Sequence, residues 1–362
     1  MKILIIHASA GAGHTKAAEA VLNGIKETTD WQVTLVDILD FTYPFYKKLY
    51  QKGYAVLVSR FSWLWGIFFE LTDVVWLRGI VRIIRRMINH MNTRGLIRYL
   101  EKEKFDDVIS THFFSNEVLG YLKRNRMINA RIVSIVTDFD VHSIWLAEGI
   151  DQYAVASDFT KERLVQLGVA GEKIKVSGIP VDRKFCVKRD RNALRDALGL
   201  RRDLFTVLVA TGSFGIGPIE EIITALNGFQ ILVVCGHNQH LFKSLSQKKQ
   251  EFLKVNGLVN NMDELMAAAD VMITKPGGLS ISEALVSHLP LIFFNAIPGQ
   301  ETHNIEVLKK YSIGLSRCSI VQMVQELKKF QASPELLSAA QNNTQRLARP
   351  NAVSEIIALI HG

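Results

Sequence analysis

The chain has 362 residues, 48% of them hydrophobic and 22% charged, and its formal net charge is +8. This length exceeds what one hydrophobic core normally supports and predicts two domains, while the composition excludes a disordered or low-complexity chain. The three cysteines are far apart in the sequence and odd in number, which argues against a disulfide framework and for a reducing compartment.

The first residues have the pattern of a buried strand and not that of a targeting segment. KILIIH (2–7) runs straight into a glycine loop, where a secretory signal would have a cleavage site. No uncharged apolar stretch reaches the roughly 18 to 20 residues that spanning a bilayer requires. We therefore expect a protein of the cytoplasmic side, peripheral if it is attached to the cell membrane.

Short runs rich in valine and isoleucine recur through the first half of the chain. Because these runs are continuously apolar and do not alternate, they predict parallel strands covered on both faces, and hence an α/β domain. A helical pattern covers residues 14–26, and the predicted strands are residues 2–7, 32–37, 107–112, 130–138, 151–157 and 174–180.

A densely charged stretch, residues 183–203, interrupts this alternation and predicts an interdomain connection with a short helix. A second α/β series follows, with strands at residues 204–212, 229–237, 254–259, 270–275 and 289–295, and helical patterns run from about 320 to 360. We therefore expect two Rossmann-like domains facing across a cleft, with ligands at the carboxyl ends of the strands. The predicted domains are residues 1–185, with a C-terminal helix at about 346–362 packing back on them, and residues 204–345.

The loop after the first strand reads Ser9-Ala10-Gly11-Ala12-Gly13-His14 and opens a helix. Glycines let backbone amides approach an anion, and a helix N-terminus adds partial positive charge. The loop fits neither a dinucleotide fingerprint, because Lys16 stands where a small residue is needed, nor a Walker A loop. His14 at the helix start is expected to have a pKa lowered by the helix dipole, which would keep it neutral and able to accept a proton.

Two further motifs follow strands in the second half. In KPGGLSISEA (275–284), two glycines and a helix start could cradle phosphate, and Glu283 lies one turn into the helix, where it could accept hydrogen bonds from ribose or simply cap the helix. PGQETHN (298–304) gathers amide and carboxylate groups suited to sugar hydroxyls, although a solvated loop would look similar.

Taken together, these motifs resemble glycosyltransferase family 28. The pattern KPGGxSxSEAL, then LP, then PGQExxN is similar to the C-terminal signature of that family. AGAGH at the start, VTDFDVHSIW (136–145) and VSGIPVD (176–182) narrow the resemblance to the branch of monogalactosyldiacylglycerol synthases and diacylglycerol glucosyltransferases.

The resemblance implies a GT-B fold and an inverting, metal-independent transfer of a hexose from UDP-glucose or UDP-galactose to a membrane lipid, 1,2-diacylglycerol. It implies that His14 is the catalytic base, and Asp138, in the TD…H…W stretch with His142, is the rival for that role. The donor-binding residues that it implies are Gly11, Gly13, Gly212, Ser213, Phe214, Asn261, Met262, Lys275, Gly277, Gly278, Ser280, Glu283, Gln300, Glu301 and Asn304.

No metal and no other cofactor are expected, since the UDP-sugar is itself a substrate. Negative charge grows on the departing diphosphate in such a transfer, and two glycine-loop helix starts offer positive potential there. Asp138-Phe139-Asp140 has the spacing of a D-x-D metal site but lies in the TD…H…W stretch.

Residues 41–100 carry ten basic and only two acidic residues, an excess that equals the net charge of the whole chain, together with thirteen aromatics. Basic and aromatic side chains interleaved in this way suit the headgroup region of an anionic membrane, and VRIIRRMINHMNTRGLIRYL (81–100) has the spacing of an interfacial amphipathic helix. Aromatic residues at helical spacing also form protein cores, and half of these could pack inward. Nucleic acid is not expected, because FSWLWGIFF (61–69) is too continuous for a base-stacking platform. The expected membrane and acceptor residues are Trp63, Trp65, Phe68, Phe69, Arg82, Arg85 and Arg86.

Three alternatives remain open at this point. One is another GT-B enzyme, such as an N-acetylglucosaminyltransferase acting on a polyprenyl-linked precursor. A second is a soluble sugar-nucleotide epimerase, which would not need the aromatic and basic segment. The third is a non-catalytic module that binds UDP-sugar or a membrane surface, which would not need a base.

Overall fold

The computed structural model describes residues 1–9, 11–73, 89, 92–212, 215, 217–294, 296–316 and 318–361. Five of the expected site residues lie outside this description, namely Ser213, Phe214, Arg82, Arg85 and Arg86, as do the side chains of Phe68 and Phe69. The chain forms two compact units. Unit 1 comprises Met1–Arg183, Ile297–Asn304 and Arg349–Gly362, and unit 2 comprises Lys184–Ala296 and Ile305–Ala348.

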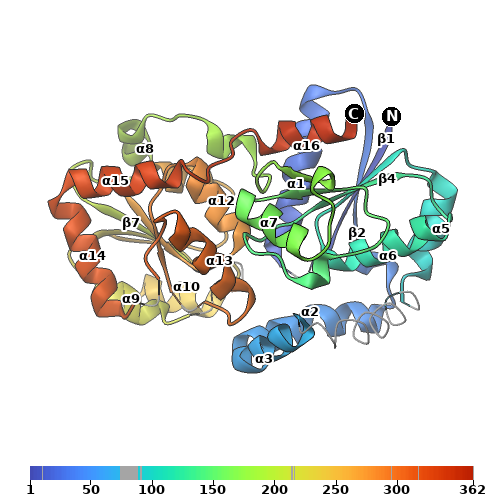
Figure 1. Cartoon of the computed structure of the whole chain (residues 1–362). Helices are drawn as coiled ribbons and strands as arrows, with labels where there is room; N and C mark the ends of the chain where they lie inside the picture. Colours follow the sequence, from blue (N-terminus) through green and yellow to red (C-terminus); the bar gives the residue numbers. More distant parts are fainter. Residues whose placement is uncertain are drawn as a thin grey trace. The chain divides into compact units, whose positions relative to one another are not determined.

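Unit 1 is built on a parallel sheet with the strand order β2-β1-β3-β4-β5-β6 (Figure 1). Ile3 of β1 lies opposite Val33 on one side and Asp107 on the other. All six strands predicted for this half are present, several of them shorter than expected: β1 (Lys2–His7), β2 (Gln32–Asp37), β3 (Asp107–Ser110), β4 (Arg131–Ile135), β5 (Gln152–Val155) and β6 (Ile174–Val176).

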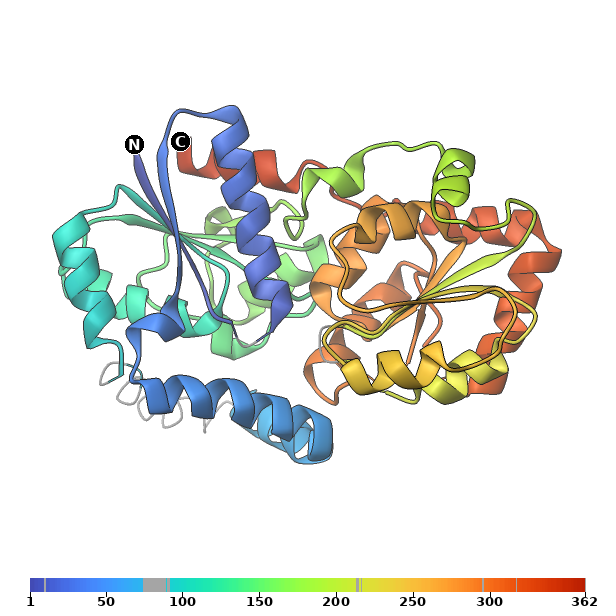
Figure 2. The same cartoon turned by 180° about the vertical axis from the view of Figure 1, so that it is seen from behind.

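Helices cover both faces of this sheet, which explains why its strands are continuously apolar. Successive side chains of a strand point to opposite faces. Ile3 and Ile5 therefore pack with α1 (Ala12–Thr28) and α16 (Ala352–His361), which lie together (Figure 2). Leu4 and Ile6 point to the opposite face, where the core is completed by η1 (Ile38–Phe41), α5 (Arg94–Glu103), α6 (Phe113–Arg124) and α7 (Asp158–Gln166).

Two helices of unit 1 carry the aromatic and basic segment, α2 (Pro44–Arg60) and α3 (Ser62–Asp73), and they pack against each other. The aromatic residues around them whose side chains the structure describes form two groups of four, and Trp65 is half-buried. Four pack against the core of unit 1: Phe41, Tyr46, Tyr50 and Tyr99. Four others are exposed: Tyr43, Phe45, Phe61 and Trp63.

The amphipathic helix expected at residues 81–100 lies mostly outside the described residues. Its last part is the start of α5, where Leu96, Ile97 and Leu100 are buried in the core of unit 1. For these residues the expectation of an interfacial helix was wrong, because their apolar face packs against protein. Within the described residues, no helix combines the length and the apolar character needed to cross a bilayer.

Unit 2 contains a second parallel sheet, with the strand order β11-β10-β7-β8-β9. Its strands confirm the second predicted series: β7 (Thr206–Ala210), β8 (Gln230–Val234), β9 (Leu253–Asn256), β10 (Val271–Thr274) and β11 (Leu291–Phe293). One core contains residues of α9 (Ile219–Ala225), α10 (Gln239–Ser246) and α14 (Ile320–Ala332). The other described helices of unit 2 are α8 (Arg191–Ala197), α11 (Met262–Ala268), α12 (Gly278–Val286) and α15 (Pro334–Thr344), and α13 (Gln300–Lys310) belongs to unit 1 up to Asn304 and to unit 2 from Ile305.

The charged stretch 183–203 packs on unit 2 instead of running free. Its helix α8 contacts α11, and Arg195 is buried with its guanidinium 2.7 Å from Asp270. Arg191 pairs with the same carboxylate at 2.7 Å. These pairs explain the charge density of the stretch, since buried charges in proteins are normally paired. The structure thus begins unit 2 at Lys184 and assigns Ile297–Asn304 to unit 1.

Candidate active site

The glycine loop of unit 1 is held open at the carboxyl end of β1. Gly11 is the N-cap of α1 in an extended conformation, and no described side chain caps this helix start. Ser9 is bonded through its hydroxyl and its amide to Asp37, at the end of β2, and its hydroxyl accepts a hydrogen bond from Gln51 Nε2 on α2 at 2.7 Å. Backbone amides at this helix start therefore remain available to an anion.

His14 lies on the first turn of α1 and contacts residues that follow two neighbouring strands. Its Nδ1 is 2.8 Å from the carbonyl oxygen of Thr111, after β3, and 2.9 Å from Oγ1 of Thr137, after β4. Because a carbonyl oxygen only accepts hydrogen bonds, the imidazole proton lies on Nδ1 and the lone pair on Nε2. The ring is therefore oriented as a proton acceptor.

The pKa of His14 is lowered to about 4, which is the direction that the sequence analysis predicted. Its main cause is burial, which disfavours the charged imidazolium, and nearby His7 lowers the pKa further, whereas the bond to Thr111 raises it. The sequence analysis did not include burial as a cause of this shift. His112, whose ring centroid is 4.5 Å from that of His14, also has a pKa well below its usual value because of burial.

Asp138 is buried and bonded to two amides that come from a distant part of the chain. Its carboxylate accepts hydrogen bonds from Gln300 Nε2 at 2.9 and 3.1 Å and from Asn304 Nδ2 at 3.3 Å. Burial raises the pKa of Asp138 to about 6, although both amides act in the opposite direction. The TD…H…W stretch and the PGQExxN motif, separate in sequence, therefore form one structure.

The three residues expected around the donor sugar from the PGQExxN motif differ in exposure. Asn304 is fully buried, and its Oδ1 accepts from the amides of Phe139 at 2.8 Å and Asp140 at 3.3 Å. A residue with no exposed surface contacts no sugar in this arrangement, so that expectation is not met for Asn304. Glu301 accepts from the amide of Ile297 at 2.7 Å, and Gln300 is half-buried at the pocket.

His303, which the sequence analysis did not select, lies between two carboxylates. Its Nε2 is 3.0 Å from Oε1 of Glu70 on α3, and its Nδ1 is 3.3 Å from Oδ2 of Asp140. The only sequence signal was its position inside the PGQExxN motif, because the acidic partners lie far away along the chain.

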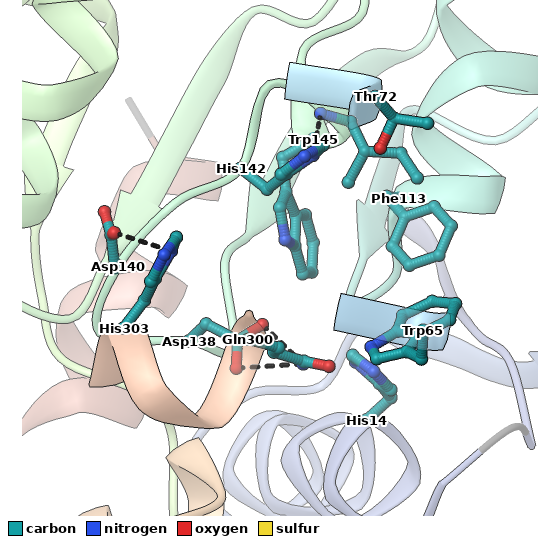
Figure 3. Close-up of a pocket in the computed structure, with 11 residues that line it drawn as sticks. His14, Trp65, Thr72, Phe113, Asp138, Asp140, His142, Trp145, Gln300 and His303 are labelled. Atoms are coloured by element: carbon teal, nitrogen blue, oxygen red, sulfur yellow. Dashed lines mark hydrogen bonds and ion pairs between the residues drawn. The ribbon is translucent and has the colours of Figure 1, made fainter. Parts of the chain in front are cut away.

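These residues surround a pocket of unit 1 with about 560 Å³ of space not filled by atoms, part of which is open to solvent (Figure 3). One wall is aromatic and apolar, and the other is polar. The lining residues are His14, Trp65, Thr72, Phe113, Asp138, Asp140, His142, Ile144, Trp145, Gln300 and His303. The sequence analysis gave no site role to Thr72, Phe113, Ile144 or Trp145, although Ile144 and Trp145 lie in the VTDFDVHSIW motif, because a side chain that lines a pocket and one that fills a core have the same local pattern.

The two tryptophans expected at the membrane have different environments. Trp63 is 61% exposed on α3, whereas Trp65 is half-buried and lines the pocket. Helix geometry explains the difference, because residues two positions apart point about 200° apart around the axis. Only Trp63 faces solvent in the way that a membrane contact requires.

Unit 2 gathers its expected donor-binding residues at the carboxyl edge of its sheet. Gly212 follows β7 with a φ of +69°, a left-handed conformation that favours glycine. Gly277 caps α12 after the neighbouring strand β10, and no described atom lies within 4 Å of where a Cβ would be at either glycine. This edge is therefore open to close approach by a ligand.

The remaining donor-binding candidates of unit 2 lie before and on α12 and at the start of α11. Lys275 is half-buried and its carbonyl accepts from the amide of Gly277 at 2.9 Å. Ser280 and Glu283 are half-buried on α12. Asn261 is the N-cap of α11, which begins at Met262, and its side chain donates to Glu264 at 2.9 Å. Among the described residues, no group of three or more His, Cys, Asp or Glu side chains has the geometry to hold a metal ion.

Comparison with known proteins identifies both halves of the chain. Residues 14–181 match the family model of monogalactosyldiacylglycerol (MGDG) synthase, and residues 206–353 match the glycosyltransferase family 28 C-terminal domain. A processive diacylglycerol beta-glucosyltransferase of Bacillus cereus strain G9842 is 31% identical over 320 residues, covering 85% of this chain and 80% of that protein.

Solved structures agree on the fold. MurG of Acinetobacter baumannii superposes with a TM-score of 0.59 at 13% identity, covering 99% of each chain. The UDP-GlcNAc 2-epimerase of Neisseria meningitidis gives a TM-score of 0.62 at 14% identity, covering 100% of each chain. Two parallel sheets with flanking helices are the GT-B architecture, so the predicted fold class is confirmed. The chain is therefore a glycosyltransferase that belongs to family 28, in the branch of the monogalactosyldiacylglycerol synthases.

Proposed function

We propose that this enzyme transfers glucose from UDP-glucose to the free hydroxyl of 1,2-diacylglycerol, with inversion and without a metal ion. The choice of acceptor and of glucose is supported by the relatives, which are named as diacylglycerol beta-glucosyltransferases. A pocket in unit 1 with an apolar aromatic wall suits the glycerol end of a lipid.

The observation that carries the proposal is the state of His14. The ring is neutral above its pKa of about 4, its proton is directed to the carbonyl of Thr111, and it lines the pocket. A base must be unprotonated and within reach of the acceptor, and this histidine meets the first condition throughout the physiological range.

In the proposed reaction, one bond to the anomeric carbon forms and one breaks. The lipid hydroxyl oxygen attacks the anomeric carbon of the sugar, and its proton passes to Nε2 of His14. The bond between the anomeric carbon and the β-phosphate oxygen breaks, and UDP leaves with the electron pair. Attack opposite the leaving group inverts the anomeric centre.

Backbone amides take the role that a metal has in other transferases. In unit 2 the start of α12, with Gly277, Gly278 and Ser280, offers N–H groups and the positive end of a helix to the diphosphate. In unit 1 the start of α1, with Gly11 and Gly13, offers the same groups to an anion. Glu283 accepts from the ribose hydroxyls, and Asn261 and Met262 hold the uracil. Gly212 and Lys275 complete the phosphate contacts.

Asp138 acts in this proposal as a positioning residue and His14 as the base. The Asp138 carboxylate is occupied by the amides of Gln300 and Asn304, which supports a structural task over proton transfer. With its nitrogen bonded to Asp138, the Gln300 amide presents its carbonyl oxygen to a sugar hydroxyl, and Glu301 stands beside it.

The exposed side chains of α2 and α3 attach the enzyme to the cytoplasmic face of the membrane. Tyr43, Phe45, Trp63 and Ile67 are each at least 50% exposed, an unusual density of apolar groups for a solvated surface. The surrounding lysines and arginines favour an anionic bilayer.

The test is a donor screen with the purified full-length chain and vesicles of phosphatidylglycerol, phosphatidylcholine and diacylglycerol. UDP-glucose is expected to give glucosyldiacylglycerol, identified by mass, at the same rate with and without EDTA. UDP-galactose and UDP-N-acetylglucosamine serve as competing donors. Transfer only to a polyprenyl-linked acceptor, epimerisation of the nucleotide sugar, or binding without consumption of donor would each contradict the proposal, and loss of activity in EDTA would contradict its metal-independent step.

A further inference from the structure

Helix α3 has one face in solvent and the other at the catalytic pocket. Trp63, Leu64, Ile67 and Leu71 are between 43% and 61% exposed. The opposite face contributes Trp65 and Thr72 to the pocket lining, and their spacing of seven residues places them two turns apart on one side of the helix. The same helix therefore presents an apolar surface outward and a wall of the pocket inward.

The approach of α3 to the site is close and depends on a glycine. A Cβ at the buried Gly66 would lie 2.6 Å from Cβ of Pro298, in the segment that precedes Gln300. The helix also contacts η2 (Ser143–Trp145), which carries the Trp145 side of the pocket. Two separate walls of the site thus touch α3.

His303 links α3 to the loop that carries Asp138. Glu70 of α3 and Asp140 of the loop approach opposite nitrogens of the same ring, at 3.0 and 3.3 Å. Each contact uses a different nitrogen of the ring, so one imidazole joins a carboxylate of α3 to a carboxylate of the loop. Neither partner can be lost without loosening the bridge.

We propose that the bridge Glu70–His303–Asp140 is a latch that holds α3 against the catalytic pocket and so positions the lipid acceptor at His14. His303 and Glu70 are positioning residues, and the inference rests on the proposed transfer to a lipid hydroxyl. The outward face of α3 lies in the membrane surface, and its inward face closes the pocket. The lipid acceptor therefore passes from the bilayer to the base along this one helix.

The Glu70→Gln substitution distinguishes the latch from simple membrane anchoring by α3, because the two predict opposite effects on activity. Glu70 is an exposed acidic residue next to apolar side chains, so removing its charge should strengthen binding to anionic vesicles. If α3 were only an anchor, the Glu70→Gln variant would be as active as wild type or more active. If the latch positions the pocket wall, acceptor use falls while vesicle binding does not.

The experiment compares wild type with Glu70→Gln and with Glu326→Gln as the matched control. Glu326 forms an exposed pair with Lys329 on α14 at 3.0 Å. The measurements are vesicle sedimentation, KM for UDP-glucose, and kcat/KM for two acceptors: diacylglycerol in vesicles and a short-chain diacylglycerol dissolved in water. We expect Glu70→Gln to lower kcat/KM for both acceptors by about two- to fivefold, the range of an exposed ion pair, with KM for UDP-glucose unchanged.

A second variant, Gly66→Ala, disturbs the packing of α3 against the pocket at Pro298 and leaves the bridge residues unchanged. The added methyl group meets the rigid ring of Pro298, so a loss of about tenfold for both acceptors is expected. An unchanged circular dichroism spectrum and an unchanged affinity for UDP will show that the variant is folded.

The inference is overturned if Glu70→Gln equals wild type, or if its defect disappears with the dissolved acceptor, because α3 would then serve only as an anchor. A wild-type enzyme that makes no glycolipid from any donor overturns the proposed function and this inference with it.

Discussion

Each unit has a helix that starts at a glycine with no described side-chain cap, α1 in unit 1 and α12 in unit 2, but the side chains that these helices place differ. In both, a loop after a parallel strand leads to a glycine at the helix N-cap, and no described side chain caps the helix that follows. In unit 1 the helix α1 brings His14 onto the carbonyl of Thr111, whereas in unit 2 the helix α12 brings Glu283 to a half-buried position one turn further along.

If both helix starts bind an anion, as proposed, the side chains nearby decide the chemistry. A histidine made neutral by burial can take a proton. A carboxylate in the same region can only accept hydrogen bonds from a ligand or repel its charge. We therefore expect His14 in unit 1 to contribute mainly to bond-making and Glu283 in unit 2 mainly to donor affinity, and the following experiments separate these tasks.

The largest expected effect is that of His14→Ala. Loss of a general base costs about 10²- to 10⁴-fold in kcat, and the affinity for UDP, measured by calorimetry, should stay at the wild-type value. His240→Ala, an exposed histidine on α10, is the control and should be fully active. A variant at position 14 that keeps kcat but loses UDP affinity would reverse the assignment of tasks.

A smaller effect is expected for Glu283→Ala. Hydrogen bonds to a charged group contribute about 1.5–3 kcal/mol, so KM for UDP-glucose should rise by about tenfold or more while kcat changes little. Wild-type enzyme given a donor that lacks the ribose 2′-hydroxyl should show a similar loss, and the variant should no longer distinguish the two donors. Glu221 on α9 is exposed, so Glu221→Ala controls for the loss of a surface carboxylate.

The smallest effect concerns pH and Asp138. Its pKa of about 6 means that the carboxylate is ionised above pH 6 and protonated below it. Protonation makes one oxygen a donor, which opposes the Gln300 amide, so kcat/KM should fall as pH drops through 6, and the Asp138→Asn variant should be less active but flat from pH 5 to 8.

Unfolding is a separate source of an acid limb, because the lowered pKa values of His7, His14 and His112 make the fold lose stability as pH falls below 6.5; circular dichroism at each pH separates the two effects. A carboxyl whose pKa is raised in the folded state stabilises the fold fully below its unfolded value, 3.8, and loses that contribution as pH rises through 6. Asp138 thus favours folding over the range in which activity declines. His14, with a pKa of about 4, stays neutral there, so an acid limb near 4 with none near 6 would identify His14 as the titrating group and contradict the role given to Asp138.

The strands and the glycine loops were predictable because their signals are local. Runs such as KILIIH and TVLVA need only a few consecutive apolar residues to become buried strands, and each loop follows directly from its strand. The family resemblance was equally local, since it rests on short motifs, and the comparisons with known proteins confirm it.

The sequence by itself therefore determined the two sheets, the positions of His14 and Glu283 at helix starts, and the family. Only the tertiary structure joined Asp138 to Gln300, 162 positions away, buried Asn304, turned Trp65 inward and Trp63 outward, and placed His303 between two carboxylates. Local periodicity specifies which face of an element is apolar but not which distant element will cover it. The partners of a side chain, and the pKa that burial gives it, are decided only when the chain has packed.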